Sequence, residues 1–203
     1  VVTHDEQKLG LASSGAVTLN RPDKIRVART GGFTDIEMIF DGKTLTLLGK
    51  LANRYTQLDV PGSLDHLFDE LKNTYNWPLP ASDLLLSKAY DELMRDVVDV
   101  KDLGSGVIGG IECDHLAFRT SEVDWQIWIA QGKQPVPYRF MITSKLVNGG
   151  PQYAIQTRNW KTKGAVTAAD FQFKNTTKAE KVDLKDLKGA DDLPDHFVMG
   201  DAK

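Results

Sequence analysis

The chain contains a single cysteine, Cys113, and it lacks any long run of apolar residues. One cysteine cannot form an internal disulfide and does not by itself make a zinc site. A membrane-spanning helix needs about 18 consecutive apolar residues, and no window of this sequence approaches that length. The sequence therefore predicts neither an internal disulfide nor a membrane-spanning helix, and its cysteine does not reveal a redox compartment.

An excess of charge of one sign is also lacking. The 25 Lys and Arg residues and 28 Asp and Glu residues are interspersed and leave a net charge of −3. Nucleic-acid-binding proteins usually carry a basic stripe, so this balance argues against such a partner. The apolar share of 41% and the charged share of 26% are ordinary globular values. A chain of 203 residues is long enough for one buried core, and we predict a single domain over residues 1–203.

The familiar nucleotide-binding and catalytic motifs are incomplete. The run Asp41-Gly42-Lys43-Thr44 resembles the end of a phosphate loop, but Glu37 stands where that loop needs its first glycine. The glycine-rich stretch 104–110 precedes a strand pattern and not a helix, so it favours a strand connection over a dinucleotide loop. No Gly-x-Ser-x-Gly elbow is present.

The adjacent residues Cys113, Asp114 and His115 invite a catalytic or metal-binding interpretation. Three neighbours on a strand do not converge on one ion, and a packed, hydrogen-bonded His115 is the simpler interpretation. We predict no catalytic residue, no metal site and no cofactor. A hydrolase that uses His115, or His66 on the first helix, is the least favoured alternative.

Hydrophobic periodicity predicts a mainly β, α+β fold. Strand patterns occupy residues 17–21, 25–29, 36–40, 44–48 and 54–60, and then 111–119, 124–130, 138–146, 153–160 and 170–173. Asp41-Gly42 is the strongest hairpin signal. The regular spacing of these short strands indicates an antiparallel meander, with a tail over 184–203 that wraps the surface or is mobile.

Two helices interrupt the strands. Ser63 can cap the first helix, and its apolar stripe at positions i, i+3, i+4 and i+7 consists of Leu64, Leu67, Phe68 and Leu71. The second helical stretch covers about residues 82–98 and is broken near Ser87. Its stripe consists of Leu86, Tyr90, Leu93, Met94 and Val97.

The segment DWQIWI, residues 124–129, places two tryptophans on one predicted strand. Because strand side chains alternate between faces, Trp125 and Trp128 point to opposite sides of the sheet. This pattern suggests a curved sheet with an apolar concave side. Two interpretations stay open: a well-filled core, or helices that cover only part of the concave face and leave an apolar cleft.

Several motifs together resemble the LolA and LolB lipoprotein-carrier superfamily. They are RPDKIRV at 21–27, IFDGKTL at 39–45 and GAVTAADFQF at 164–173. The motifs PASDLLL at 80–86, CDHLAFR at 113–119 and DWQIWI are more similar to an uncharacterised family of predicted periplasmic proteins with that fold. The resemblance extends from about Ser14 to Val182.

The resemblance implies an open half-barrel, a curved antiparallel sheet with helices plugging its concave side. It also implies secretion to the bacterial periplasm with the signal peptide removed, and binding of a lipid, acyl chain or lipoprotein without catalysis. In the carriers, the arginine of the Arg-Pro motif helps to hold the helical lid closed, and the matching residue is Arg21. The carriers begin with a helix before the first strand, so we expect part of the lid to have been cut away or lost here. Lys174-Asn175-Thr176-Thr177 replaces their proline-rich turn.

We therefore predict a periplasmic binding protein for a lipid or lipoprotein, with a possible membrane-associated delivery partner. The predicted cleft lining is Phe40, Leu47, Leu67, Phe68, Leu71, Leu86, Met94, Trp125 and Phe140. The alternative is an interaction or scaffold protein whose concavity is filled by its own side chains.

Overall fold

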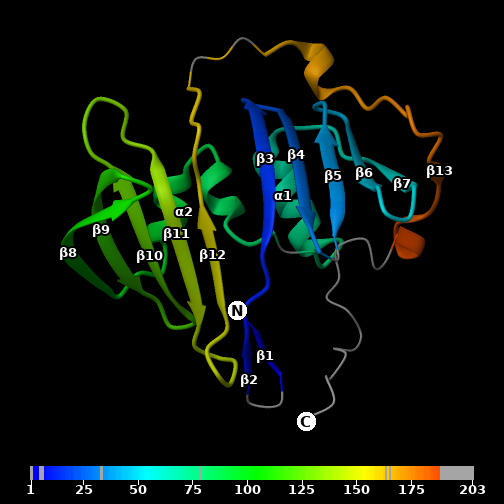
Figure 1. Ribbon diagram of the computed structural model, residues 1–203. Helices are drawn as coiled ribbons and strands as arrows, with labels where there is room; N and C mark the ends of the chain where they lie inside the picture. Colours follow the sequence, from blue (N-terminus) through cyan, green and yellow to red (C-terminus); the bar gives the residue numbers. More distant parts are fainter. Residues whose placement is uncertain are drawn as a thin grey trace. The chain divides into compact units, whose positions relative to one another are not determined.

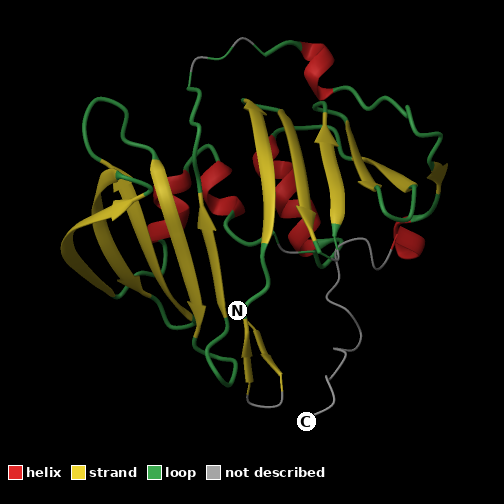
Figure 2. Cartoon of the chain, viewed as in Figure 1, coloured by secondary structure: helices red, strands yellow, loops and turns green. Residues whose placement is uncertain are grey.

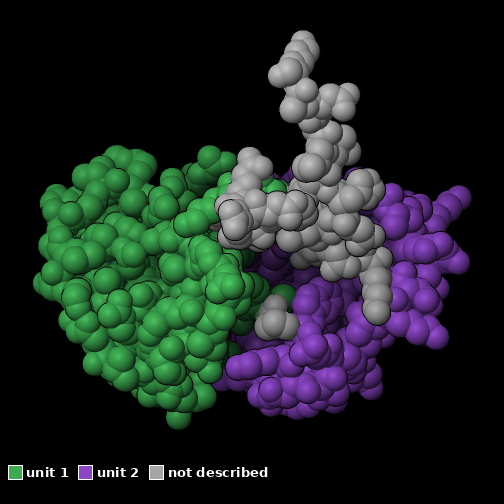
Figure 3. All heavy atoms as spheres, turned by 90° about the horizontal axis from the view of Figure 1, so that it is seen from below, with its two compact units in different colours: residues 1–11, 79–164 green, residues 12–78, 165–203 purple. Residues whose placement is uncertain are grey.

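The computed structural model describes residues 2–4, 7–32, 34–77, 79–162, 164 and 166–187. The chain divides into two compact units, shown in different colours in Figure 3. Unit 1 comprises Val1–Leu11 and Leu79–Gly164, and unit 2 comprises Ala12–Pro78 and Ala165–Lys203. Each unit contains a mainly antiparallel sheet and helical segments (Figures 1 and 2). The single domain over residues 1–203 stays a prediction.

Unit 2 is built on a six-stranded sheet with the order β13-β7-β6-β5-β4-β3. Its strands are β3 (Ser13–Asn20), β4 (Lys24–Gly31), β5 (Asp35–Phe40), β6 (Thr44–Gly49), β7 (Arg54–Asp59) and β13 (Glu180–Lys181). All neighbours pair antiparallel except β13, which pairs parallel with β7. The predicted hairpin between β5 and β6 is confirmed: the Asp41 carboxylate accepts hydrogen bonds from the Lys43 and Thr44 amides, and Gly42 adopts φ 98°.

Helix α1 (Leu64–Asn73) lies across one face of this sheet (Figure 1). The hydroxyl of Ser63 accepts a hydrogen bond from the His66 amide, as the predicted cap requires. The predicted apolar stripe of α1 is fully buried. Cross-strand register places Ile25, Phe40 and Leu45 side by side on one face of the sheet, and all three are buried. The prediction of the first helix and of its buried stripe is confirmed.

The C-terminal segment covers the second face of the six-stranded sheet. Residues 170–173 were predicted as a strand, and this prediction is wrong: Ala168–Phe171 forms a 3-10 helix, η2. The physical reason is a capping box in which the Asp170 carboxylate accepts hydrogen bonds from the Thr167 amide and hydroxyl. Phe171 is completely buried. A further turn, η3 (Leu184–Leu187), buries Leu187; the rest of the predicted tail lies outside the described residues.

Unit 1 contains a five-stranded antiparallel sheet with the order β12-β11-β10-β9-β8. Its strands are β8 (Asp99–Ile108), β9 (Ile111–Arg119), β10 (Val123–Ala130), β11 (Pro137–Ser144) and β12 (Gln152–Gln156). A short hairpin, β1 (Val2–His4) and β2 (Gln7–Leu9), belongs to the same unit. The strands β9 to β12 were predicted, although β12 ends four residues before the predicted boundary at residue 160.

Strand β8 was missed, because Gly104, Gly106 and three charged residues dilute its apolar pattern. A bulge between Asp102 and Ser105 also breaks its alternation. The second helical stretch is shorter than predicted: η1 (Ser82–Leu85) and α2 (Ala89–Met94) are separated at Ser87, and the chain is already extended in β8 from Asp99. The predicted break near Ser87 is confirmed.

The two tryptophans of β10 lie on opposite faces, as predicted. Trp125 stacks on Phe118 with ring centroids 3.8 Å apart, on the face that η1 and α2 cover. Trp128 stacks on His115 at 4.0 Å on the other face, and the Arg139 guanidinium lies 5.4 Å from the Trp128 ring centroid. The mainly β fold with helices beside antiparallel sheets is thus confirmed, and its strands belong to two larger sheets and a small hairpin.

Candidate ligand-binding site

The candidate site is the apolar face of the five-stranded sheet in unit 1. Its centre is a cluster of five buried residues: Ala81, Phe118, Trp125, Ile127 and Phe140. Cross-strand register explains the cluster, because Trp125 lies opposite Phe118 on β9, and Ile127 lies opposite Phe140 on β11. The Trp125 and Phe140 ring centroids are 5.7 Å apart. Large side chains from three strands therefore form one continuous apolar surface.

The helical segments cover this surface incompletely. Neither η1 nor α2 contributes a fully buried side chain. Nine apolar residues pack against the cluster while staying partly exposed: Leu84, Leu93, Met94, Val97, Leu116, Val123, Ile129, Ile142 and Ile155. The face also extends beyond its cover, since Val100 lies opposite Phe118 on the edge strand β8 and is 50% exposed. An apolar ligand could bury this surface without displacing a closed core.

The predicted lining residues divide between the two units. Leu86, Met94, Trp125 and Phe140 belong to unit 1, with Trp125 and Phe140 at the centre of the cluster and Met94 packed against it. The other five, Phe40, Leu47, Leu67, Phe68 and Leu71, are all buried in unit 2 between the sheet and α1. Their role in ligand binding stays a prediction.

Sequence reasoning placed Leu93 and Val97 on the helical stripe but left both out of the predicted lining. Tyr90 was placed on that stripe too, yet it is 74% exposed although it lies within α2. Leu84 and Val100 were missed. The apolar run Leu84-Leu85-Leu86 was the available signal for the first, and nothing local singled out the second.

The predicted lid-holding residue, Arg21, is exposed at the end of β3. Its neighbour Pro22 makes the contact with α1, because the Pro22 carbonyl accepts a hydrogen bond from the Leu64 amide at 2.9 Å. The Arg-Pro turn therefore anchors the first residue of α1 through its backbone. The role of the Arg21 side chain itself stays a prediction.

His115 is engaged in packing and hydrogen bonding. Its Nε2 lies 2.9 Å from the Gln126 amide oxygen, and its ring stacks on Trp128. Burial raises the pKa of the Cys113 thiol, which disfavours the thiolate that a nucleophile needs. Within the described parts of the chain, no group of three or more His, Cys, Asp or Glu side chains could hold a metal ion.

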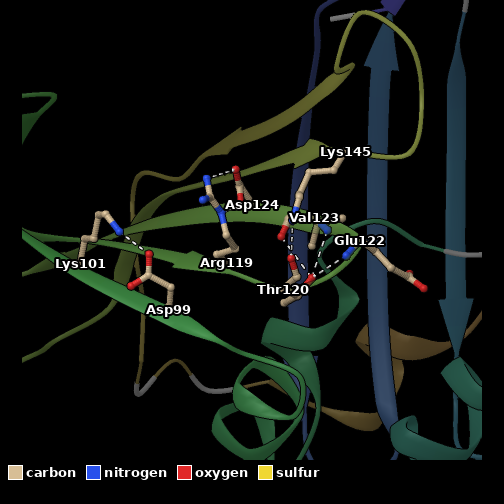
Figure 4. A network of polar contacts seen from close by, with 8 residues as sticks. All are labelled: Asp99, Lys101, Arg119, Thr120, Glu122, Val123, Asp124 and Lys145. Atoms are coloured by element: carbon tan, nitrogen blue, oxygen red, sulfur yellow. Dashed lines mark hydrogen bonds and ion pairs between the residues drawn. The ribbon is translucent and has the colours of Figure 1, made fainter.

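A polar network occupies the face of the same sheet opposite Trp125, at the end where β8 begins (Figure 4). The Arg119 guanidinium donates two hydrogen bonds to the Asp124 carboxylate, at 2.9 and 3.1 Å. This contact holds the pKa of Asp124 below its ordinary value and raises that of Arg119. Lys101 pairs with Asp99 and lowers the pKa of that carboxyl. Arg119 and Lys101 are thus paired with carboxylates, and the Lys145 ammonium donates to the Thr120 carbonyl at 2.7 Å.

Two comparisons with known proteins give a match, one to a solved structure and one to a family model. The chain is similar to the crystal structure of the Mycobacterium tuberculosis lipoprotein LppX, with 14% identity, 77% of this chain and 87% of that chain covered, and a TM-score of 0.41. No curated protein matches the chain. Among the described residues, no helix combines the length and apolar character needed to cross a membrane. The model of a family of predicted periplasmic proteins matches residues 1–185, as the sequence motifs had indicated, and the chain belongs to this family, described as "Predicted periplasmic protein (DUF2092)".

Proposed function

We propose that this protein is a non-enzymatic periplasmic binding protein that holds the acyl chain of a lipid or lipoprotein on the apolar face of the five-stranded sheet. The observation that carries this proposal is the incomplete cover of that face: η1 and α2 bury none of their side chains fully. An exposed apolar surface bordered by polar residues is a common mark of a binding site. A membrane-associated partner that delivers or receives the ligand fits this role.

The energetics favour an acyl chain. Burying each CH₂ group contributes roughly 0.8 kcal/mol, so a 16-carbon chain offers on the order of 12 kcal/mol before costs. Association costs several kcal/mol in lost translational and rotational freedom. Aliphatic and aromatic side chains suffice for such binding, and a cover that already leaves Leu93 and Met94 partly exposed needs little rearrangement.

The first experiment is native mass spectrometry of the protein secreted to a bacterial periplasm, with organic extraction of bound molecules. A fatty acid, phospholipid or lipopeptide at about one per chain would support the proposal and identify the ligand class. A clean apo mass, with no uptake of added lipids, would contradict it.

A matched pair of variants locates the site. Val100→Asp places a charge on the apolar face of β8 in unit 1 and is expected to weaken palmitate binding at least tenfold, since a buried charge is strongly disfavoured. Val17→Asp is the control: Val17 lies on the edge strand β3 of unit 2 and is 55% exposed, against 50% for Val100. If Val17→Asp weakens binding and Val100→Asp does not, the ligand belongs to unit 2 and the proposed site is wrong.

The alternative is an interaction or scaffold protein, and one observation favours it. The core between α1 and the six-stranded sheet is completely filled: Phe40, Leu45 and Leu67 have no exposed surface. A protein without any lipid uptake but with a stable protein partner would have this second function.

A further inference from the structure

A cavity lies in unit 2, on the face of the six-stranded sheet opposite α1. It has a volume of about 290 Å³. Residues of β5, β6 and β7 form its floor, and the segment Phe171–Phe173 forms a wall. This cavity is separate from the apolar face of unit 1, so an inference about it does not depend on the proposed function.

Two of the three residues in a cross-strand row of the cavity floor are polar, although a sheet face packed against Phe171 would ordinarily be apolar. Ile39, Thr46 and Gln57 form one cross-strand row, because Ile39 pairs with Thr46 and Thr46 pairs with Gln57. Thr46 is only 3% exposed. The alternating residues Leu45 and Leu47 point to the other side, toward α1. Two groups that can donate and accept hydrogen bonds are thus held in a half-enclosed position.

Hydrogen bonds fix the orientation of these groups. The Gln57 amide nitrogen donates to the Thr46 hydroxyl at 3.2 Å, and the Lys181 ammonium donates to the Gln57 amide oxygen at 3.1 Å. One amide proton of Gln57 and the hydroxyl proton of Thr46 have no acceptor among the described residues. The floor therefore presents two oriented donors and needs no rearrangement to use them.

The rim adds acceptors and an aromatic surface. One oxygen of the Asp41 carboxylate accepts both hydrogen bonds of the hairpin turn, at 2.9 Å each, and the second oxygen has no partner within the described ranges of the chain. The side chains of Thr44 and Gln172 complete the polar edge. Phe173 is held against Tyr55 with ring centroids 4.8 Å apart, and it lines the cavity beside the buried Phe171.

We propose that this cavity binds a neutral polyhydroxylated molecule, a monosaccharide or the sugar part of a glycoconjugate. Sugar hydroxyls both donate and accept hydrogen bonds, as do the threonine and amide groups here. The C–H faces of a sugar ring pack against an aromatic side chain such as Phe173. The residues that line the cavity include the Asp41 carboxylate and no Lys or Arg, so the site favours a neutral ligand over an anion. Its polar floor disfavours an acyl chain.

Saturation-transfer NMR and calorimetry on the full chain test the proposal. The probes are methyl α-glucoside, methyl β-galactoside and a short glucan, with inorganic phosphate as an anionic probe. Thr46→Val and Gln57→Leu each remove a hydrogen-bonding group at nearly constant volume, and each is expected to weaken sugar binding by about fivefold to tenfold. Thr56→Val is the control, because Thr56 is also 3% exposed but lies opposite Leu47, on the α1 face.

Each outcome of the binding experiments either supports or overturns the proposed sugar site. Binding of a monosaccharide glycoside that depends on Thr46 and Gln57 indicates a site for free sugars, and binding of the glucan alone indicates the sugar part of a larger molecule. No binding of any sugar, equal binding by the Thr46→Val and Thr56→Val variants, or preferential binding of phosphate would each overturn the proposal. Gln57 is only half-buried, so Gln57→Leu keeps the test decisive if Thr46→Val fails to fold. Palmitate binding in unit 1 is expected to be unchanged in all three variants.

Discussion

The two units cover an apolar sheet face in different ways. In unit 2, the ten-residue helix α1 buries four side chains and begins at a side-chain cap. In unit 1, the four-residue η1 and the six-residue α2 bury none and have no side-chain cap. Short helices without caps are weakly stable in themselves. The difference shows that α1 closes the core of unit 2, whereas η1 and α2 leave the apolar face of unit 1 partly exposed, as the proposed binding role requires.

Removing one leucine from each cover should give the largest contrast. Leu67→Ala is expected to lower the free energy of unfolding by about 2–5 kcal/mol, because it leaves a cavity in a closed core. Leu93→Ala should cost only about 1 kcal/mol, because Leu93 is partly exposed. Urea denaturation of both variants measures the two values. Equal losses would show that the two covers are equally tight and would break the comparison.

The helix caps provide a second, smaller contrast. Ser63→Ala removes the hydroxyl that accepts from the His66 amide and is expected to cost about 1 kcal/mol. Lys88→Ala at the corresponding position of α2 should change the free energy of unfolding by less than about 0.5 kcal/mol, since Lys88 makes no capping bond there. Thermal unfolding of the two variants is the measurement, and a larger effect at Lys88 would contradict this account of α2.

Acid should weaken the C-terminal cover of unit 2 through Asp170. Hydrogen bonds from the Thr167 amide and hydroxyl hold the pKa of Asp170 below its ordinary value. The unfolded chain therefore binds the proton more tightly, and the stabilisation is present near neutral pH and is lost as the pH falls below about 4. Asp170→Asn should flatten the acid side of the stability profile, as followed by circular dichroism between pH 2 and pH 6. An unchanged profile would show that η2 does not depend on this cap.

The smallest expected effect is a difference in how salt changes the pKa values of Asp124 and Asp170. The pKa of Asp124 in unit 1 is lowered mainly by the Arg119 guanidinium, and screening at about 1 M salt should raise it toward its ordinary value. The pKa of Asp170 in unit 2 is lowered mainly by a backbone hydrogen bond, which salt affects much less. Carboxyl NMR titrations at low and high salt measure both. A parallel shift of the two groups would contradict these assignments.

Much of the fold could be predicted because its signals are local. The period of Leu64, Leu67, Phe68 and Leu71 predicts a helix with one apolar side, and Asp41-Gly42 predicts a hairpin. Residues 111–119 coincide with β9. Strand β8 and η2 were not predicted. Glycines dilute the apolar alternation of β8, and the capping box between Thr167 and Asp170 overrides the strand pattern of residues 170–173.

Only some of the predicted lining residues lie at the candidate site. Trp125, Phe140 and Met94 were chosen as lining residues, and they lie in or against the unit 1 cluster. Phe40, Leu47 and Leu67 were chosen on the same grounds and lie in the closed core of unit 2. Apolar periodicity is identical for a filled core and for an open binding face, so the pattern alone does not separate the two groups.

The sequence by itself determined which residues of each element share a face, because that depends only on the periods of the helix and the strand. It placed Trp125 and Trp128 on opposite sides of β10 before any contact was known. The tertiary structure alone decided which faces are sealed. Burial depends on which distant segment packs on each face, and this explains why Phe171 is buried against the six-stranded sheet. It also explains why Val100 stays exposed at the edge of the apolar face of unit 1.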